Sequence, residues 1–334
     1  MKDPAAGDPL LAIDGLRIAA REGEIVRAAD LAVGRREVVG LFGESGCGKT
    51  TLGLGVVGLL DPALRVTQGE IRIAGRVTVS PSLDETSALR GVQIGFIPQD
   101  PFSSFNPLRR VGPQIGRVLR LHHGASRRAT ETKALELLSA LGVTDPRGVA
   151  ASFPHELSGG LLQRAVIAAT LIGEPELLIA DEPTTALDVV VQNQVLLAFL
   201  RLVRELGTAL LIITHDLGVL AETADRLAAM YAGSIVEFGP VSSVLGKPRH
   251  PYVGALLGSM VRPSRKQQQL SVIDGQPPSL PGYLEPCAFA PRCSRAQPRC
   301  YSEEPTYKWP ASSGAACHFP LGSFPEDRAS RVTQ

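Results

Sequence analysis

The chain of 334 residues has no apolar run that approaches the ~18 to 20 residues needed to span a bilayer. Its N-terminus, MKDPAAGDPLLAIDG, lacks the basic patch and the apolar core of a signal peptide. The chain also lacks an excess of one charge, since its 34 Lys and Arg residues almost balance its 33 Asp and Glu residues. The net charge therefore does not support a nucleic-acid partner. Internal repeats and low-complexity tracts are also lacking. We therefore expect a protein of the cytosol that does not itself cross a membrane.

What the sequence does contain is a rhythm of short apolar segments and helix-like stretches, with 44% apolar residues. Four such segments predict strands of a parallel sheet buried on both faces: Val38–Gly43, Gln93–Gln99, Leu177–Asp181 and Ala209–His215. A stretch without an obvious strand, at about residues 105–165, predicts a helical subdomain inserted into this α/β core. From Pro277 onward prolines, glycines and cysteines crowd together, which indicates a separate C-terminal appendix.

The stretch GESGCGKT after the first predicted strand fits the phosphate-loop pattern G-x-x-x-x-G-K-[ST]. Glycines let the backbone curve round a polyphosphate and point N–H groups at it, while Lys49 reaches the outer phosphates and Thr50 can hold Mg²⁺. A Gly-rich turn before an ordinary helix is the alternative. The residues expected to bind the nucleotide are Gly43, Glu44, Ser45, Gly46, Cys47, Gly48, Lys49, Thr50 and Thr51.

A second candidate feature is the apolar strand that ends in Asp181 and Glu182, roughly 130 residues after the loop. A solvated strand end explains such a pattern when it stands alone. Beside a phosphate loop, Asp181 can orient Mg²⁺ and its water, and Glu182 remains to handle the attacking water.

Between these two motifs lies LSGGLLQR, and here the chain resembles the ATP-binding-cassette ATPases. Ser158, Gly159 and Gly160 match that family's signature, which binds the γ-phosphate held by the opposite subunit. The resemblance implies a P-loop cassette: a RecA-like core with an antiparallel β subdomain and an inserted helical subdomain.

Further landmarks of this family occur in order. Gln99 matches the Q-loop residue that contacts Mg²⁺ or water, Asp188 in Ala186-Leu187-Asp188 matches the D-loop, and His215 matches the switch histidine. The resemblance implies catalysis by Lys49, Glu182 and His215 in a head-to-tail dimer.

Within the family the chain is most similar to the ATPases of dipeptide and oligopeptide importers. The stretches QDPFSSFNPLRRVGPQI, DEPTTALDVVVQNQV, HPYVGALLGSM and PCAFAPRCSRAQPRC carry this finer match. It implies an ATPase domain over residues 1–245 and a transporter-type C-terminal region over 246–334. The implied partners are two transmembrane permeases, a second, related ATPase and an extracytoplasmic binding protein, with this chain on the cytoplasmic face of the membrane.

Four of the five cysteines lie in the tail, at Cys287, Cys293, Cys300 and Cys317. Four thiols in a reduced compartment can close one tetrahedral metal site or hold one cubane cluster. The resemblance to importer ATPases favours a 4Fe-4S cluster, with zinc as the alternative ligand. The simplest alternative is that the four are ordinary core cysteines or form disulfides. Cys47 stands apart, and we expect only its backbone to matter.

Two positions depart from the family pattern. The stretch that usually supplies an aromatic residue to stack on adenine ends here in Ala20, so we expect weaker ATP binding with triphosphate recognition retained. Leu161 replaces the usual glutamine of the signature, at a position where the peptide-importer branch often has an apolar residue.

Three other functions remain open from the sequence. Nickel and other small-solute importers share the same ATPase design, and cargo choice lies in other subunits. A soluble cassette acting on DNA or the ribosome usually carries a coiled coil, tandem cassettes or basic arms, which this sequence lacks. The presence of both Glu182 and His215 argues against a silent regulatory cassette, whereas Ala20 leaves some room for one.

Overall fold

The computed structural model describes residues 8–184, 189–259, 273–282, 284–305 and 313–322. Its strands join one 12-stranded sheet in the order β6-β5-β4-β1-β2-β11-β10-β3-β9-β8-β7, with β12 paired to β11. The strands are β1 (Leu11–Ala20), β2 (Gly23–Val33), β3 (Val38–Phe42), β4 (Arg65–Ile73), β5 (Arg76–Ser80), β6 (Leu83–Asp84), β7 (Ile94–Ile97), β8 (Leu177–Asp181), β9 (Ala209–Ile213), β10 (Arg226–Tyr231), β11 (Ser234–Pro240) and β12 (Gly314–Ala315).

Strands β10, β3, β9, β8 and β7 pair in parallel and form the core of the molecule. Every residue of β3, β8 and β9 is buried, which is what the unbroken apolar runs predicted. The second run, predicted over Gln93–Gln99, forms a shorter strand than expected: β7 spans Ile94–Ile97, and Gln99 lies beyond its end. Pro98 explains the difference, since proline has no N–H to donate to a neighbouring strand.

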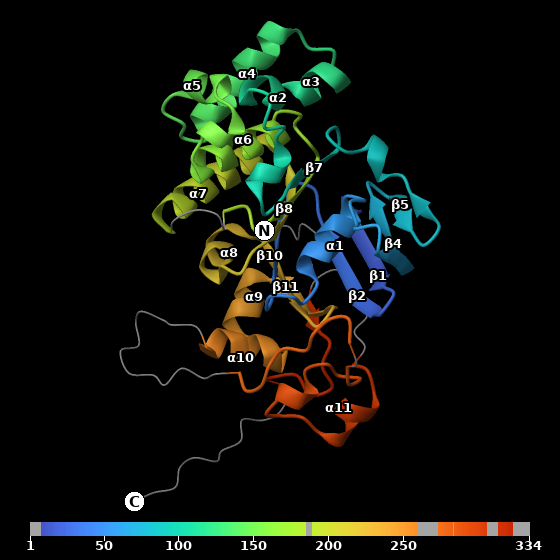
Figure 1. Ribbon diagram of the computed structural model, residues 1–334. Coiled ribbons are helices and arrows are strands. Elements are labelled where there is room, and N and C mark those ends of the chain that lie inside the picture. Colours follow the sequence, from blue (N-terminus) through green and yellow to red (C-terminus); the bar gives the residue numbers. More distant parts are fainter. Residues whose placement is uncertain (1–7, 185–188, 260–272, 283, 306–312, 323–334) are drawn as a thin grey trace, which may run out of the picture.

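The other half of the sheet is antiparallel and comprises β1, β2, β4, β5 and β6. It joins the parallel half through a short parallel pairing of β11 with β2, between Ser234 and Ala28. Helix α1 packs against strands of both halves, so the first apolar core lies between them. This arrangement confirms the cassette core with an antiparallel β subdomain (Figure 1).

Most of the inserted segment is helical and lies at one end of the molecule, farthest from the C-terminal elements (Figure 1). None of the described helices is long and apolar enough to cross a membrane. The helices are α1 (Lys49–Val56), α2 (Val111–Ile115), α3 (Arg117–His122), α4 (Arg127–Ala140), α5 (Pro146–Ala151), α6 (Gly159–Leu171), α7 (Val189–Leu206), α8 (Leu217–Thr223), α9 (Val241–Gly246), α10 (Pro251–Ser259) and α11 (Pro298–Ser302). The domain boundaries at about 105, 165 and 245 stay a prediction.

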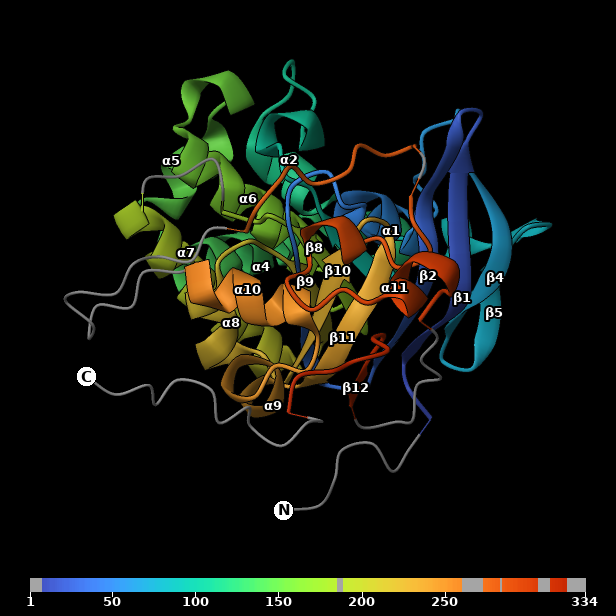
Figure 2. The same cartoon turned by 90° about the horizontal axis from the view of Figure 1, so that it is seen from below.

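The C-terminal elements pack against the parallel core. Figures 1 and 2 show α10 beside β10 and β11, and β12 adds to the edge of β11 through the pairs Glu237–Ala315 and Phe238–Gly314. The second apolar core includes Tyr231 of β10, Tyr252 of α10 and Phe289. The C-terminal region thereby rests directly on strands that flank the nucleotide loop.

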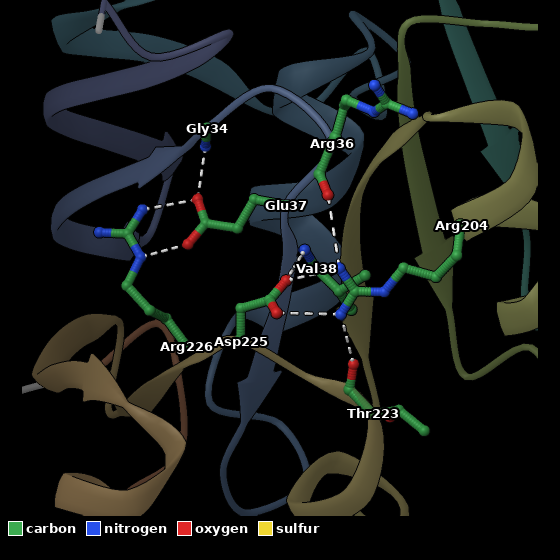
Figure 3. Close-up of polar contacts among 8 residues, drawn as sticks. All are labelled: Gly34, Arg36, Glu37, Val38, Arg204, Thr223, Asp225 and Arg226. Carbon is green, nitrogen blue, oxygen red and sulfur yellow. Dashed lines mark hydrogen bonds and ion pairs between the residues drawn. The ribbon is translucent and has the colours of Figure 1, made fainter. Parts of the chain in front are cut away.

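A network of charged side chains holds the beginning of β3 (Figure 3). The carboxylate of Asp225 accepts a hydrogen bond from the Val38 N–H at 2.8 Å and another from Arg204 at 3.0 Å. Beside it, Arg226 pairs with the buried carboxylate of Glu37. These contacts anchor the strand whose far end leads into the phosphate loop.

Candidate functional site

The phosphate loop follows β3 and leads into helix α1. Gly43, Gly46 and Gly48 have φ angles of 156°, 77° and 102°, in the region that L side chains rarely adopt. A Cβ atom on Gly43 would lie 2.1 Å from the carbonyl oxygen of Met230. Glycine is therefore required at the start of the loop both for its backbone conformation and for its lack of a side chain. The loop ends at the N-terminus of α1, where free N–H groups favour anions.

The side chain of Lys49 lies over this loop and is 8% exposed. Its Nζ donates to the carbonyl oxygens of Gly43 at 2.9 Å and Glu44 at 3.0 Å. It also lies 3.8 Å from Sγ of Cys47, whose carbonyl oxygen accepts from the Gly233 N–H at 3.0 Å. The Cys47 thiol therefore contacts the lysine, while the expected role of its backbone in nucleotide binding stays a prediction.

Asp181 lies at the end of β8, next to the loop. It is 2% exposed, its carboxylate is hydrogen-bonded to the Thr50 side chain, and its Oδ1 atom is buried with no hydrogen-bond partner among the described residues. Burial raises the pKa of Asp181, while the hydrogen bond from Thr50 opposes the rise. A buried, unpaired carboxylate oxygen beside a threonine hydroxyl suits a hydrated Mg²⁺ ion, because hard cations prefer oxygen ligands.

Glu182 and His215 meet at the ends of neighbouring parallel strands. Nδ1 of His215 lies 2.8 Å from Oε2 and 3.0 Å from Oε1 of Glu182. The Glu182 side chain is 15% exposed and the His215 side chain is 63% exposed, so the pair opens toward solvent. Glu182 has a φ of 47°, and its N–H donates to the Ile213 carbonyl at 2.8 Å, which holds this unusual backbone in place.

The remaining predicted residues lie on other elements. Gln99 follows β7, whose carboxyl end is next to that of β8. Ser158 is the N-cap of α6, and its hydroxyl accepts from the Leu161 N–H at 3.4 Å, with Gly159 and Gly160 opening the helix. Asp188, with Ala186 and Leu187, lies outside the described residues. Ala20 ends β1, at the hairpin into β2.

The contacts that the C-terminal region makes with the loop were not predicted from the sequence. Arg292 pairs with the Glu44 carboxylate through two hydrogen bonds, of 2.7 and 3.0 Å, across 248 positions of sequence. The Tyr252 hydroxyl accepts from the Glu44 N–H at 2.9 Å. Neither Arg292 nor Tyr252 belongs to a motif with a recognisable spacing. The only sequence signal that could have pointed to them is that both lie in stretches that match the family's C-terminal segment.

The four tail cysteines are all described and none forms a disulfide. Cys287 donates its N–H to the Cys300 carbonyl at 3.0 Å. Burial raises the pKa of Cys317 to about 11, and the thiols of Cys287, Cys293 and Cys300 are near enough to add to that rise. Among the described residues, however, no three His, Cys, Asp or Glu side chains are arranged to hold a metal ion, so an iron-sulfur or zinc site is not shown.

Comparison with known proteins identifies two families along the chain. The ABC transporter family matches residues 26–185, and the oligopeptide/dipeptide transporter C-terminal region matches residues 236–300. The chain is 41% identical over 278 residues to the dipeptide transport ATP-binding protein DppD of Bacillus subtilis, covering 83% of each chain. It is 38% identical over 291 residues to DppD of Escherichia coli, covering 87% of this chain and 89% of that protein.

A solved dimeric ATP-binding cassette, bound to ADP and Pi after hydrolysis, has the same fold. It superposes with a TM-score of 0.61 at 26% identity, over 69% of this chain and 98% of that one. Fold, loop and sequence agree with the expected family. The chain is an ATP-hydrolysing subunit that belongs to the ABC transporter family, in the branch of dipeptide and oligopeptide import ATP-binding proteins.

Proposed function

We propose that this chain hydrolyses ATP to energise the uptake of dipeptides or oligopeptides across the cytoplasmic membrane. The observation that carries the proposal is the convergence of the Lys49 amine, the unpaired Asp181 oxygen and the Glu182–His215 pair around one phosphate loop, on a chain with the peptide-transporter C-terminal region.

The loop residues 43–51 bind the triphosphate of ATP in this proposal. Lys49 neutralises the outer phosphates, and Thr50, Asp181 and Gln99 hold Mg²⁺ through oxygen atoms or through water. When bound, Mg²⁺ supplies positive charge against the phosphate oxygens. The positions of Thr50 and Asp181 support their share of this role, because a hydrogen bond already joins them.

Glu182 is the general base that orients the attacking water and accepts its proton. His215 holds the Glu182 carboxylate through Nδ1, which leaves the other edge of its exposed ring free to reach the γ-phosphate. Catalysis by such groups consists mainly of positioning and charge stabilisation.

A second subunit completes each site. Ser158, Gly159 and Gly160 cap the ATP held by the partner's loop, with the N-terminus of α6 directed at the γ-phosphate. Asp188 contributes to the same dimer interface. We propose that the partner is a related ATPase, so that the working unit is a heterodimer that hydrolyses ATP poorly when one chain is alone.

The dimer attaches to two permease subunits at the cytoplasmic face of the membrane, and an extracytoplasmic binding protein delivers the cargo. Closure of the dimer on ATP and its opening after hydrolysis then drive the permeases. The names of the relatives, dipeptide and oligopeptide transport proteins, support these partners.

For the C-terminal region we propose a 4Fe-4S cluster held by Cys287, Cys293, Cys300 and Cys317, with a structural role. The mutual interaction of the four thiols supports a shared group. Zinc in a tetrahedral four-thiolate site is the alternative, since four thiolates can hold either group. Iron, sulfide and zinc contents of the purified chain, with the visible spectrum, test this. Cys293→Ser must lose the group and Cys47→Ser must keep it.

The transport proposal is tested by the ATPase rate of the chain assembled with its permeases, partner ATPase and binding protein. We expect stimulation by a pool of dipeptides and oligopeptides. Stimulation by nickel chelates alone would overturn the cargo and retain the ATPase, and activity that needs no membrane subunit would favour a soluble cassette.

A further inference from the structure

Glu44, the second residue of the phosphate loop, is held by an arginine from the C-terminal region. Nη1 of Arg292 lies 2.7 Å from Oε2 of Glu44, and Nη2 lies 3.0 Å from Oε1. The Arg292 side chain is only 6% exposed and that of Glu44 is 21% exposed. This is a fork-to-fork pair in a mostly buried setting, the geometry in which an arginine–carboxylate contact is strongest and most directional.

The guanidinium of Arg292 is itself fixed from other sides. Its Nε donates to the Asp274 carbonyl at 3.0 Å, and Nη1 also lies 3.3 Å from the Tyr231 hydroxyl. Its Cζ lies 5.8 Å from the centre of the Tyr231 ring. Because these contacts use groups outside the loop, Arg292 is positioned independently of Glu44 and can impose a position on it.

A tyrosine from the same region holds the backbone of Glu44. The Tyr252 hydroxyl accepts from the Glu44 N–H at 2.9 Å, and the Tyr252 ring is fully buried. This ring lies 4.7 Å from that of Tyr231 and 5.6 Å from that of Phe289. Both the side chain and the backbone of one loop residue are therefore held by the C-terminal region.

The charge of Glu44 gives these contacts a consequence for nucleotide binding. A carboxylate within a loop that must accept a polyphosphate repels the ligand unless a cation neutralises it and holds it in place. The Glu44 carbonyl also accepts from the Lys49 amine at 3.0 Å, so movement of Glu44 would displace the lysine that meets the phosphates.

We propose that Arg292 is a positioning residue for ATP binding: it neutralises Glu44 and, together with Tyr252, holds the phosphate loop in its binding shape. The inference rests on ATP binding at this loop and makes the C-terminal region part of the nucleotide site's support. Arg292 touches no reacting atom, so its removal acts on affinity and leaves the chemical step nearly unchanged.

The test measures the Kd of a fluorescent ATP analogue for the full-length chain, and KM and kcat for ATP in the assembled transporter. We expect Arg292→Gln to raise Kd and KM about tenfold and to change kcat less than about twofold. Adding Glu44→Gln in the same chain removes the unneutralised carboxylate and should restore Kd to within about threefold of the parent. Arg292→Lys keeps the charge without the fork and should raise Kd about threefold.

Arg299→Gln is the matched control. Arg299 precedes Cys300 as Arg292 precedes Cys293, but its side chain is 57% exposed and pairs with Glu303, the residue that follows α11. Iron and zinc content and the thermal unfolding midpoint are recorded for each variant. These values distinguish unfolding of the cysteine-containing region from loss of the Arg292–Glu44 contact alone. If Arg292→Gln does not fold, the Kd of Arg292→Lys is compared with that of the parent chain instead.

Parent-like Kd in a folded Arg292 variant overturns the inference, as does an equal rise in Kd for Arg299→Gln. A parent chain that binds no ATP would instead contradict the site itself. A tenfold rise in Kd for Arg292→Gln that is reversed by adding Glu44→Gln establishes that Arg292 supports ATP binding through Glu44.

Discussion

Nδ1 of His215 lies 2.8 Å from Oε2 of Glu182. Glu182 directly follows β8, and His215 lies two positions after the end of β9, whose Ile213 is paired with Asp181 of β8. The carboxyl ends of parallel strands meet at one edge of the sheet, and ligand sites form there. The contact therefore joins the proposed base to a ring that is largely exposed and lies beside the phosphate loop.

Glu182→Gln should abolish ATP turnover and leave ATP binding intact. The amide cannot accept a proton from water, and general bases contribute about 10²- to 10⁴-fold to rates. Phosphate release by the assembled transporter measures turnover, and binding of a fluorescent ATP analogue measures affinity. Full ATPase activity in this variant would refute the assignment of Glu182 as base.

His215→Ala should lower kcat by at least about tenfold, with a smaller change in nucleotide affinity, since the imidazole positions Glu182 and reaches toward the γ-phosphate. Steady-state kinetics at saturating ATP give kcat. His122→Ala removes an exposed histidine of the helical segment and serves as the control. Equal rates for parent and His215→Ala would exclude a role in the reaction.

Arg226→Met should lower the free energy of unfolding by about 3 kcal/mol, because it leaves the buried Glu37 carboxylate without its cation. The two side chains are 14% and 6% exposed, and Nη2 of Arg226 lies 2.7 Å from Glu37 (Figure 3). Denaturant unfolding of the full chain measures the change. Arg201→Met breaks an exposed pair on α7 and should cost less than about 0.5 kcal/mol; similar losses in both variants would contradict the argument.

Glu237 should make stability depend on pH between about 4.5 and 7. Its side chain is 2% exposed and accepts from the N–H groups of Arg249 and His250, and burial raises its pKa to about 7. The folded chain thus binds a proton more tightly than the unfolded chain. This contribution is fully present below the unfolded pKa and is lost as pH rises through the folded pKa.

The unfolding midpoints of the parent and Glu237→Gln, measured from pH 4.5 to 8, test this dependence. The parent should lose several degrees relative to the variant as pH rises, since the amide cannot ionise. Taking the difference between the two chains cancels titrations that they share. Glu222→Gln, which alters an exposed carboxyl, should run parallel to the parent. A constant difference between parent and Glu237→Gln would show that Glu237 titrates alike in both states.

The amino-acid sequence by itself determined the phosphate loop, the buried strands β3, β8 and β9, and the carboxylates at the end of β8. These features are local: a glycine pattern, an apolar run and the residue that follows it specify them within a few positions. The stretch without an obvious strand predicted the helical insertion, and the family resemblance supplied the antiparallel subdomain. The predicted strand ended at Gln99, two residues beyond the end of β7 at Ile97, because Pro98 has no N–H to donate to a neighbouring strand.

Only the tertiary structure decided which of these residues meet. Strand order places Glu182 beside His215, and burial leaves one oxygen of Asp181 without a partner. Folding of the C-terminal region against β10 brings Arg292 onto Glu44, 248 positions away. No local pattern specifies such a pair, because it depends on how separate layers pack and on the direction in which each side chain then points.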